Sequence, residues 1–524
     1  NQLLTSEKWA TLAARLFHYE YPKTELDEAW KKLLFNQFHD ILGGSLIPEA
    51  VQDAMRLYQS VRDTCETTSR QALEAIGKNV DTRGEGVPIV VFNPLSWIRT
   101  GAVEVELVYD HLPEHIAVQD SQGTSTPLQI VEKTTEKGPY RLRGVFLARE
   151  VPSLGYKTYH AVETSTPPEP RTPLSVEGAN LENEFFRIEI DPQSGCVRQI
   201  HDRKNQRAVF DASGRGNQLA AIEDAGDSEG RYARQSDLAA KPSGPARDLD
   251  TVDRFQIVEN GPVRIVARVE KTYQNSRFTQ DIILYAGRDQ VDFLLTVDWH
   301  DIHRLIKAVF PYALSAPEAT WDAPYGTSVR PADGIDYPAQ KWVDLYAEGY
   351  GAALLNNARY AHDVENNVLR MNVLRSPTQP ANNTDEGLHT LGYALYPHAG
   401  RWDQARVMRK GYEFNYPLTA VTPAPHEGSW PPEKSFLAVE PEEVILEVVK
   451  QADESNQTVL RLCEMNGREE TVRLTLPRAA RSARETDLLE NPLAELRPDG
   501  DTLAFPIGPH EIKTVTVYFI GENG

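Results

Sequence analysis

The sequence has few cysteines and no long apolar run. Only three cysteines occur among its 524 residues, at positions 65, 196 and 463. An odd number of widely spaced thiols gives neither a disulfide framework nor a CxxC metal pair, so we expect a reducing, cytoplasmic location. No apolar run approaches the ~18 residues that a membrane span requires, so no insertion into a membrane is expected.

The sequence also has fewer basic than acidic residues. The chain has 55 lysines and arginines against 76 aspartates and glutamates, a formal net charge of −21. The resulting field repels nucleic acid and anionic membrane surfaces, so neither is an expected partner. Common catalytic motifs are absent as well: no GxGxxG follows a strand, and there is no P-loop, nucleophile elbow or HExxH. A neutral or cationic small ligand suits this chain better.

Apolar residues recur at intervals of three and four through the first 78 residues, which predicts helices. A second helix is expected over residues 24–42 and a third over residues 48–77. The apolar stripe of the second helix consists of Leu26, Trp30, Leu33, Leu34, Phe38 and Ile41. From residue 87 onward, short alternating strands separated by turn residues predict β-sandwiches.

The expected fold is therefore mainly β with an N-terminal α-helical bundle, a multi-domain chain in which β-sandwiches follow a three-helix domain. We expect the following domains: a helical domain at 1–80, a β-sandwich at 81–170, a large β-sandwich at 171–425 and a small C-terminal β-sandwich at 426–524.

The segment "NQFHDILGGS" places a histidine and an aspartate at the end of the second predicted helix. With helical spacing, Asn36, His39 and Asp40 share a polar edge beside the apolar stripe. Taken alone, such a pair is more often structural, because a histidine at a helix C-terminus suits the helix dipole. The functional alternative is that the imidazole binds zinc and the carboxylate receives sugar hydroxyls.

Two other polar segments are weaker candidates. "DWHDIHR" contains Asp298, His300, Asp301 and His303, but it ends a strand, where residues three apart point to opposite faces, so a turn is favoured over a metal site. The segment that contains Arg375, Asp385, Glu386 and His389 is expected to be a loop between strands, where polar residues are mostly solvated, although such loops also carry ligand contacts.

The order of these motifs resembles the glycoside hydrolase family 38 α-mannosidases, in particular their cytosolic and bacterial branch. "EAWKKLLFNQFHDILGGSLIPEAVQDA" is similar to the family's middle helical domain, and "VFNPLSW", "LTVDWHDIHRLIKAVFP", "LRSP" and "GLHTLGYALYPH" resemble successive pieces of its C-terminal β region. The chain reads LGG where the family usually reads LPG, which is a loop variation and changes no expected ligand.

The resemblance implies roles for three residues. His39 corresponds to a ligand of the active-site zinc, Asp40 to a residue that contacts the hydroxyls of the bound mannose, and Arg375 to an arginine that reaches the active site from the β region. The family's catalytic nucleophile and acid/base lie in a preceding domain, which no segment here resembles. We expect no catalytic residue in this chain itself, and a zinc site shared with the protein's own N-terminal catalytic domain.

The implied function is that of the C-terminal part of a zinc-dependent retaining α-mannosidase, which hydrolyses terminal α-mannosides of oligosaccharides. This part alone is expected to be inactive. The alternative is a non-catalytic carbohydrate-binding or assembly module, in which Trp321, Tyr325 and Tyr396 stack on sugar rings or else belong to the core. The large β surfaces are also compatible with a homo-oligomer.

Overall fold

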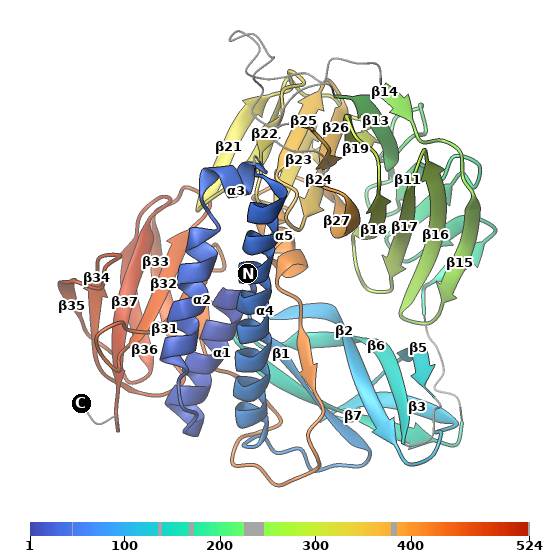
Figure 1. Cartoon of the computed structure of the whole chain (residues 1–524). Coiled ribbons are helices and arrows are strands. Elements are labelled where there is room, and N and C mark those ends of the chain that lie inside the picture. The colour runs from blue at the N-terminus through green and yellow to red at the C-terminus, as the bar shows by residue number, and fades with distance from the viewer. Residues whose placement is uncertain (45, 135–138, 167–171, 225–245, 379–384, 522–524) are drawn as a thin grey trace. The chain divides into compact units, whose positions relative to one another are not determined.

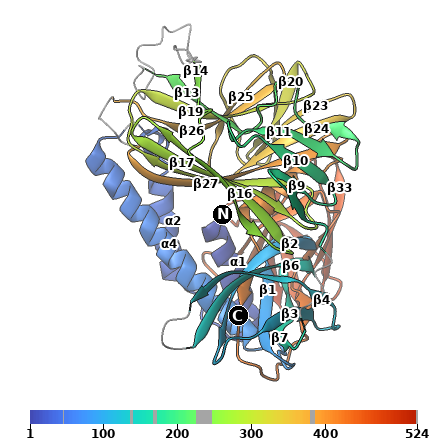
Figure 2. The ribbon, with the colours of Figure 1, turned by 90° about the vertical axis from the view of Figure 1, so that its right-hand side faces the viewer.

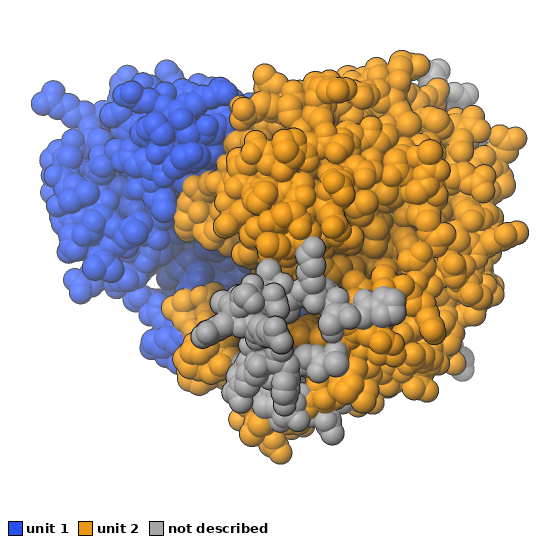
Figure 3. All heavy atoms as spheres, turned by 90° about the horizontal axis from the view of Figure 1, so that it is seen from above, with its two compact units in different colours: residues 1–33, 58–170, 416–524 blue, residues 34–57, 171–415 orange. Residues whose placement is uncertain are grey.

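The computed structural model describes residues 1–44, 46–134, 139–166, 172–224, 246–378 and 385–521. The chain groups into two compact units, coloured separately in Figure 3. Unit 1 comprises residues 1–33, 58–170 and 416–524, and unit 2 comprises residues 34–57 and 171–415. The four-domain division by segment stays a prediction.

The N-terminal region is helical, as the apolar spacing predicts (Figure 1). Its helices are α1 (Gln2–Phe17), α2 (Lys23–Phe35), α3 (His39–Gly43) and α4 (Pro48–Gly77). Within unit 1, α1, α2 and α4 share a small core of Leu3, Ala10, Leu26, Ala29, Val61 and Cys65. No helix of the described residues combines the length and apolar character that crossing a membrane requires.

The single helix expected over residues 24–42 is interrupted. α2 ends at Phe35, and Phe38 takes an extended conformation (ψ 140°) immediately before α3 begins. The fully buried side chain of Asn36 lies at this break and donates a hydrogen bond of 2.9 Å to the carbonyl oxygen of Ala54 in α4. This bond ties the residue after α2 to α4.

The rest of unit 1 is built from antiparallel sheets. One sheet has the order β28 (Thr419–Val421), β1 (Val87–Asn93), β7 (Gly155–Thr164), β3 (His115–Asp120), β4 (Ser125–Thr126), with β29 (Glu433–Ser435) paired to β7. A second has the order β2 (Arg99–Tyr109), β6 (Tyr140–Val151), β5 (Leu128–Thr134). Ile89, Val105, Phe146 and Tyr159 are buried together in the core of these sheets.

The C-terminal segment supplies the other two sheets of unit 1. One has the order β30 (Ala438–Glu440), β33 (Glu470–Thr475), β36 (Thr502–Ile507), and the other has the order β31 (Val444–Gln451), β32 (Thr458–Glu464), β37 (Ile512–Phe519), β34 (Ala480–Thr486), β35 (Pro492–Leu496). Trp9 of α1 lies in the same apolar cluster as Phe436 and Leu460. The first helix is thus part of the core that the last strands form.

In the part of unit 2 that the structure describes there are three antiparallel sheets, the largest with nine strands. Figure 2 labels strands of all three. The nine-stranded sheet has the order β15 (Arg254–Asn260), β16 (Arg264–Tyr273), β17 (Ser276–Tyr285), β18 (Val291–Trp299), β27 (Gly387–Ala399), β24 (Tyr350–Asn356), β23 (Trp342–Ala347), β20 (Glu318–Ala323), β21 (Gly326–Pro331). A second sheet has the order β14 (Ala246–Asp248), β13 (Gln218–Glu223), β19 (Arg304–Pro311), β26 (Val368–Arg375), β25 (Ala361–Glu365), β22 (Tyr337–Pro338). The third has the order β12 (Arg207–Ala208), β11 (Val197–Asp202), β10 (Phe186–Ile190), β9 (Asn180–Glu182), β8 (Ser175–Glu177).

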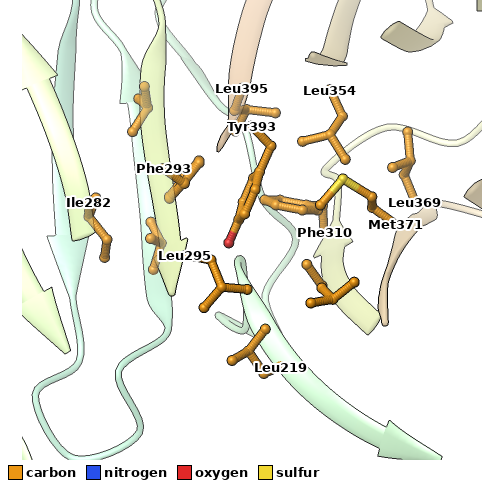
Figure 4. Packing of buried hydrophobic residues seen from close by; sticks show 14 of the residues in the cluster. Leu219, Ile282, Phe293, Leu295, Phe310, Leu354, Leu369, Met371, Tyr393 and Leu395 are labelled. Carbon is orange, nitrogen blue, oxygen red and sulfur yellow. The ribbon is translucent and has the colours of Figure 1, made fainter. Parts of the chain in front are cut away.

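Alternation along the strands of unit 2 builds its core. In β18 every second residue from Val291 to Trp299 is buried, as a strand with one face in the core requires. Figure 4 shows the ring of Tyr393 between Phe293 and Phe310. Tyr393 stacks on Phe293 at 5.1 Å between ring centroids and meets Phe310 edge-on at 6.1 Å. The predicted class, helices followed by β-sandwiches, is confirmed.

One helix of unit 2, α5 (Val407–Asn415), is absent from the sequence-based expectations. The helix is short and contains Gly411, and a glycine weakens a helical pattern in the sequence. The glycine is needed because a Cβ atom at this position would lie 2.8 Å from Cδ1 of Trp342 in β23. α5 therefore packs closely against the sheet through its smallest residue.

Candidate functional site

His39 and Asp40 form the first turn of α3. The imidazole is 81% exposed and the carboxylate 42%, and Nε2 of His39 lies 3.4 Å from Oδ1 of Asp40. The ring of Phe38 is 4.3 Å from the imidazole ring between centroids. A histidine at the start of a helix gains nothing from the helix dipole, which favours cations at the C-terminal end. His39 lies in the first turn of α3 and not at a helix C-terminus, so the helix-dipole argument for a structural histidine does not apply to it.

The expected polar edge of three residues is reduced to two. Asn36 is fully buried and bonded to α4, whereas the histidine and the aspartate that follow it face outward. The apolar stripe of the predicted helix also divides, because Leu26 is buried but Leu34 and Phe38 are more than half exposed. His39 and Asp40 thus lie among exposed apolar side chains.

Arg375 is the last residue of β26. Its guanidinium forms a bidentate ion pair with the largely buried carboxylate of Asp224, in which Nε contacts Oδ2 and Nη2 lies 3.2 Å from Oδ1. A fork held in this way has a fixed orientation. Sequence reasoning missed Asp224, which is 151 residues away along the chain, and no local pattern marks it as a partner.

The structure therefore brings His39 together with Asp40, and Arg375 together with Asp224. His39 and Arg375 each contact a carboxylate, and Asp40 is itself a carboxylate. Their roles in binding metal and sugar stay predictions.

The "DWHDIHR" segment ends β18 and connects it to β19. His300 contacts the carboxylates of Glu386 and Asp298 at 3.2 and 2.8 Å, and these contacts raise its pKa. Asp301 instead is buried and accepts hydrogen bonds from Ser276 and Asn275. The side chains of His300 and Asp301 contact separate partners and do not converge on one position for a metal ion.

The three aromatic candidates differ in burial. Trp321 lies in the core, edge-on to Tyr337, whereas Tyr325 is 42% exposed. Tyr396 is almost buried, donates a hydrogen bond to the carbonyl oxygen of Ala405, and lines a polar cavity of about 240 Å³ together with Asp202. Tyr396 therefore borders a cavity, whereas Trp321 belongs to the core.

The donors of this chain fall short of a zinc site. A catalytic zinc ion takes three protein ligands and leaves one position open. In the part of the chain that the structure describes, no group of three or more histidine, cysteine, aspartate or glutamate side chains is arranged to hold a metal ion. His39 and Asp40 supply at most two ligands, so the described residues alone do not complete a zinc site.

Three family models match the chain. They are the α-mannosidase middle domain at residues 1–76, the glycosyl hydrolases family 38 C-terminal domain at residues 181–383, and the family 38 C-terminal β-sandwich domain at residues 443–515. His39 and Asp40 lie inside the first match and Arg375 inside the second.

Known proteins agree with these matches. α-Mannosidase 2C1 of Mus musculus is 29% identical over 96% of this chain, and α-mannosidase G of Dictyostelium discoideum is 24% identical over 98%. The chain spans 46% and 50% of their lengths. The crystal structure of an α-mannosidase from Enterococcus faecalis has the same fold, with a TM-score of 0.83 at 18% identity over 99% of this chain and 66% of that one. The chain belongs to glycoside hydrolase family 38, of which it carries the middle helical domain and the C-terminal β domains.

Proposed function

We propose that the full-length protein is a zinc-dependent retaining α-mannosidase that acts on mannose-containing oligosaccharides. In this proposal the present chain supplies one metal ligand, sugar contacts and the β scaffold. A retaining glycosidase needs two carboxyl groups about 5 Å apart, one as nucleophile and one as acid/base. We assign neither to this chain and place both in an N-terminal catalytic domain. The exposed His39–Asp40 pair, in a chain of this family, is the observation that carries the proposal.

Each residue has a stated task. His39 in its neutral form offers a ring nitrogen to the metal, and its high exposure leaves that nitrogen accessible. The carboxylate of Asp40 accepts hydrogen bonds from sugar hydroxyls. Arg375, oriented by Asp224, donates hydrogen bonds to the sugar from the β region. Bound zinc would supply positive charge that orients the sugar and stabilises the transition state.

The test is a His39→Ala substitution in the full-length protein. We expect the zinc content, measured by mass spectrometry after dialysis, to fall from one ion per chain toward zero, and the mannosidase rate to fall by at least about a hundredfold. The matched control is His111→Ala, because His111 is also exposed and also contacts a carboxylate, Glu163 at 2.8 Å. A His39→Ala protein with normal zinc and normal rate contradicts the proposal.

A corollary concerns the 524-residue chain alone. Because one imidazole and one carboxylate do not complete a zinc site, the chain by itself is expected neither to hydrolyse α-mannosides nor to retain zinc. Stoichiometric zinc that survives dialysis of this chain would refute the corollary.

The proposed compartment is the cytoplasm. The three cysteines of the chain, Cys65, Cys196 and Cys463, are buried and form no disulfide among the described residues. Fractionation of cells that express the tagged full-length protein tests this assignment, and recovery in a secreted or vesicular fraction would contradict it.

A second candidate, a carbohydrate-binding module without catalysis, is favoured by one observation. The cavity beside Tyr396 is polar and, at about 240 Å³, has room for a single monosaccharide. Titration of the 524-residue chain with mannosides separates the candidates, since binding at millimolar concentration or better that a Tyr396→Ala substitution abolishes would support the module.

A further inference from the structure

The beginning of β19 lies between the two partners of the ion pair at Arg375. In the sheet order, β19 separates β13 from β26 (Figure 1). Asp224 directly follows β13, and Arg375 is the last residue of β26. Because neighbouring strands are about 4.8 Å apart, the guanidinium crosses the beginning of β19 to reach the carboxylate. The residue at this crossing, directly before β19, is His303.

Backbone hydrogen bonds fix His303 between the two partners. Its carbonyl oxygen accepts a bond of 3.0 Å from the N–H of Asp224, and its N–H donates one of 2.8 Å to the carbonyl oxygen of Ser376. Ser376 is the residue after Arg375. His303 also has a φ of 56°, in the left-handed region that residues other than glycine rarely adopt. Backbone conformations of this kind are concentrated at sites that bind ligands.

The imidazole of His303 is half-buried, and one of its two nitrogens has a partner within the chain. Nε2 lies 2.7 Å from the hydroxyl oxygen of Thr378, which holds the ring in one orientation. Among the residues that the structure describes, none forms a hydrogen bond with Nδ1. Because polar groups that leave the solvent are normally paired, this nitrogen offers a hydrogen-bonding position to a ligand.

The charge at this edge of the sheet favours a neutral ligand. The guanidinium of Arg375 and the carboxylate of Asp224 carry opposite charges and neutralise each other. A sugar hydroxyl fits beside them, because it both donates and accepts hydrogen bonds and therefore matches Nδ1 of His303 in either tautomer. Binding sites for small molecules combine a few polar groups that are held in fixed positions, as these three are.

We propose that His303 is a further sugar-binding residue, whose Nδ1 forms a hydrogen bond with a hydroxyl of the same mannose unit that Arg375 contacts. Thr378 keeps the ring oriented for this bond. The inference rests on the proposed function, which supplies the identity of the sugar and the contact of Arg375 with it.

The experiment compares two substitutions in the full-length protein. His303→Gln places an amide near the position of Nε2 and leaves that of Nδ1 empty. His303→Asn places an amide at the position of Nδ1 and leaves Thr378 without its partner, and asparagine also tolerates a positive φ. We expect His303→Gln to raise KM for 4-nitrophenyl α-mannoside at least about tenfold and to change kcat less than about threefold, because a contact of the bound substrate is lost. His303→Asn should keep KM within about threefold of the parent value.

Isothermal titration calorimetry with methyl α-mannoside gives a second measurement, the Kd, which should change by the same factors as KM. The matched control is His115→Gln, at a half-buried histidine of β3, which should keep the parent values. The reverse order, with KM and Kd raised in His303→Asn and not in His303→Gln, would overturn the inference, because His303 would then serve only to hold Thr378. Parent values in both variants would overturn it as well.

The inference and the proposed function fail separately. A full-length protein that binds methyl α-mannoside but does not hydrolyse α-mannosides contradicts the function, and the titrations still decide on His303. A protein with mannosidase activity in which both variants bind and turn over substrate like the parent contradicts the inference alone.

Discussion

The side-chain amide of Asn36 donates a hydrogen bond of 2.9 Å to the backbone carbonyl oxygen of Ala54, and the asparagine is completely buried. This single bond joins the end of α2 to α4 across 18 positions of the chain. It lies at the point where α2 ends although the apolar pattern continues, and α3 then begins at His39. The candidate ligand therefore follows a buried polar contact that the sequence pattern does not reveal.

The first prediction concerns this contact. Asn36→Ala removes the donor and leaves the carbonyl oxygen of Ala54 without this bond in a buried place, so the free energy of unfolding should fall by about 1–3 kcal/mol. Urea unfolding of the 524-residue chain measures the change. Gln37→Ala, at the exposed neighbouring position, should change the stability by less than about 0.5 kcal/mol. An Asn36→Ala protein as stable as the control would show that the bond contributes nothing.

The fold was predictable wherever a period was repeated several times. Helical spacing identified α4, the start and stop signals at Pro48 and Gly77 gave its ends, and alternation identified strands such as β18 and β27. Prediction failed at Asn36, where the apolar period continues but the helix does not. The short helix α5 was missed because Gly411 weakens its helical pattern. The glycine is required at this position because the helix backbone comes close to Trp342.

The candidate site was predictable only in part and for a similar reason. His39 and Asp40 are adjacent in sequence, so their proximity required no knowledge of the fold. The ion pair joins Arg375, at the end of β26, to Asp224, which follows β13 far away along the chain, and many other acidic residues were equally eligible partners. Long-range polar pairs follow from sheet topology, which alternation alone does not determine.

The second prediction separates a functional from a structural histidine. Because the imidazole of His39 is 81% exposed, His39→Ala should change the free energy of unfolding of the 524-residue chain by less than about 0.5 kcal/mol. Chemical denaturation measures it. A loss above about 1 kcal/mol would mean that this histidine supports the fold, and the loss of activity expected in the full-length protein would then need another explanation.

The third prediction concerns the ion pair at the end of β26. Asp224 is largely buried, so Arg375→Ala leaves its carboxylate without the guanidinium and should destabilise the chain by about 1–3 kcal/mol. Arg375→Lys should recover only part of this loss, since an ammonium group does not make the bidentate contact. A double-mutant cycle with Asp224→Asn should give a coupling of about 1 kcal/mol, and a coupling near zero would contradict the pair.

The last prediction is a pH dependence in the helical core of unit 1. Glu7 of α1 is buried and accepts hydrogen bonds from the indole N–H of Trp30 at 3.3 Å and the hydroxyl of Tyr21 at 3.4 Å. Burial disfavours its charged form and raises its pKa from 4.5 to about 7. Between these two values the folded chain holds a proton that the unfolded chain has lost, so the free energy of unfolding falls as the pH rises through this window.

Glu7→Gln should remove this dependence, because the amide oxygen still accepts both hydrogen bonds and no charge is buried. At pH 8, above both pKa values, the variant should be more stable than the parent by about 3 kcal/mol, the free-energy equivalent of the shift, whereas at pH 4 the two should differ little. Urea unfolding at a series of pH values measures the difference. Glu20→Gln, at an exposed position after α1, is the control and should follow the parent throughout. A Glu7→Gln variant that also runs parallel to the parent from pH 4 to 8 would mean that Glu7 is charged in the folded chain, with compensation from Lys450 of β31, whose charge lowers the pKa of Glu7.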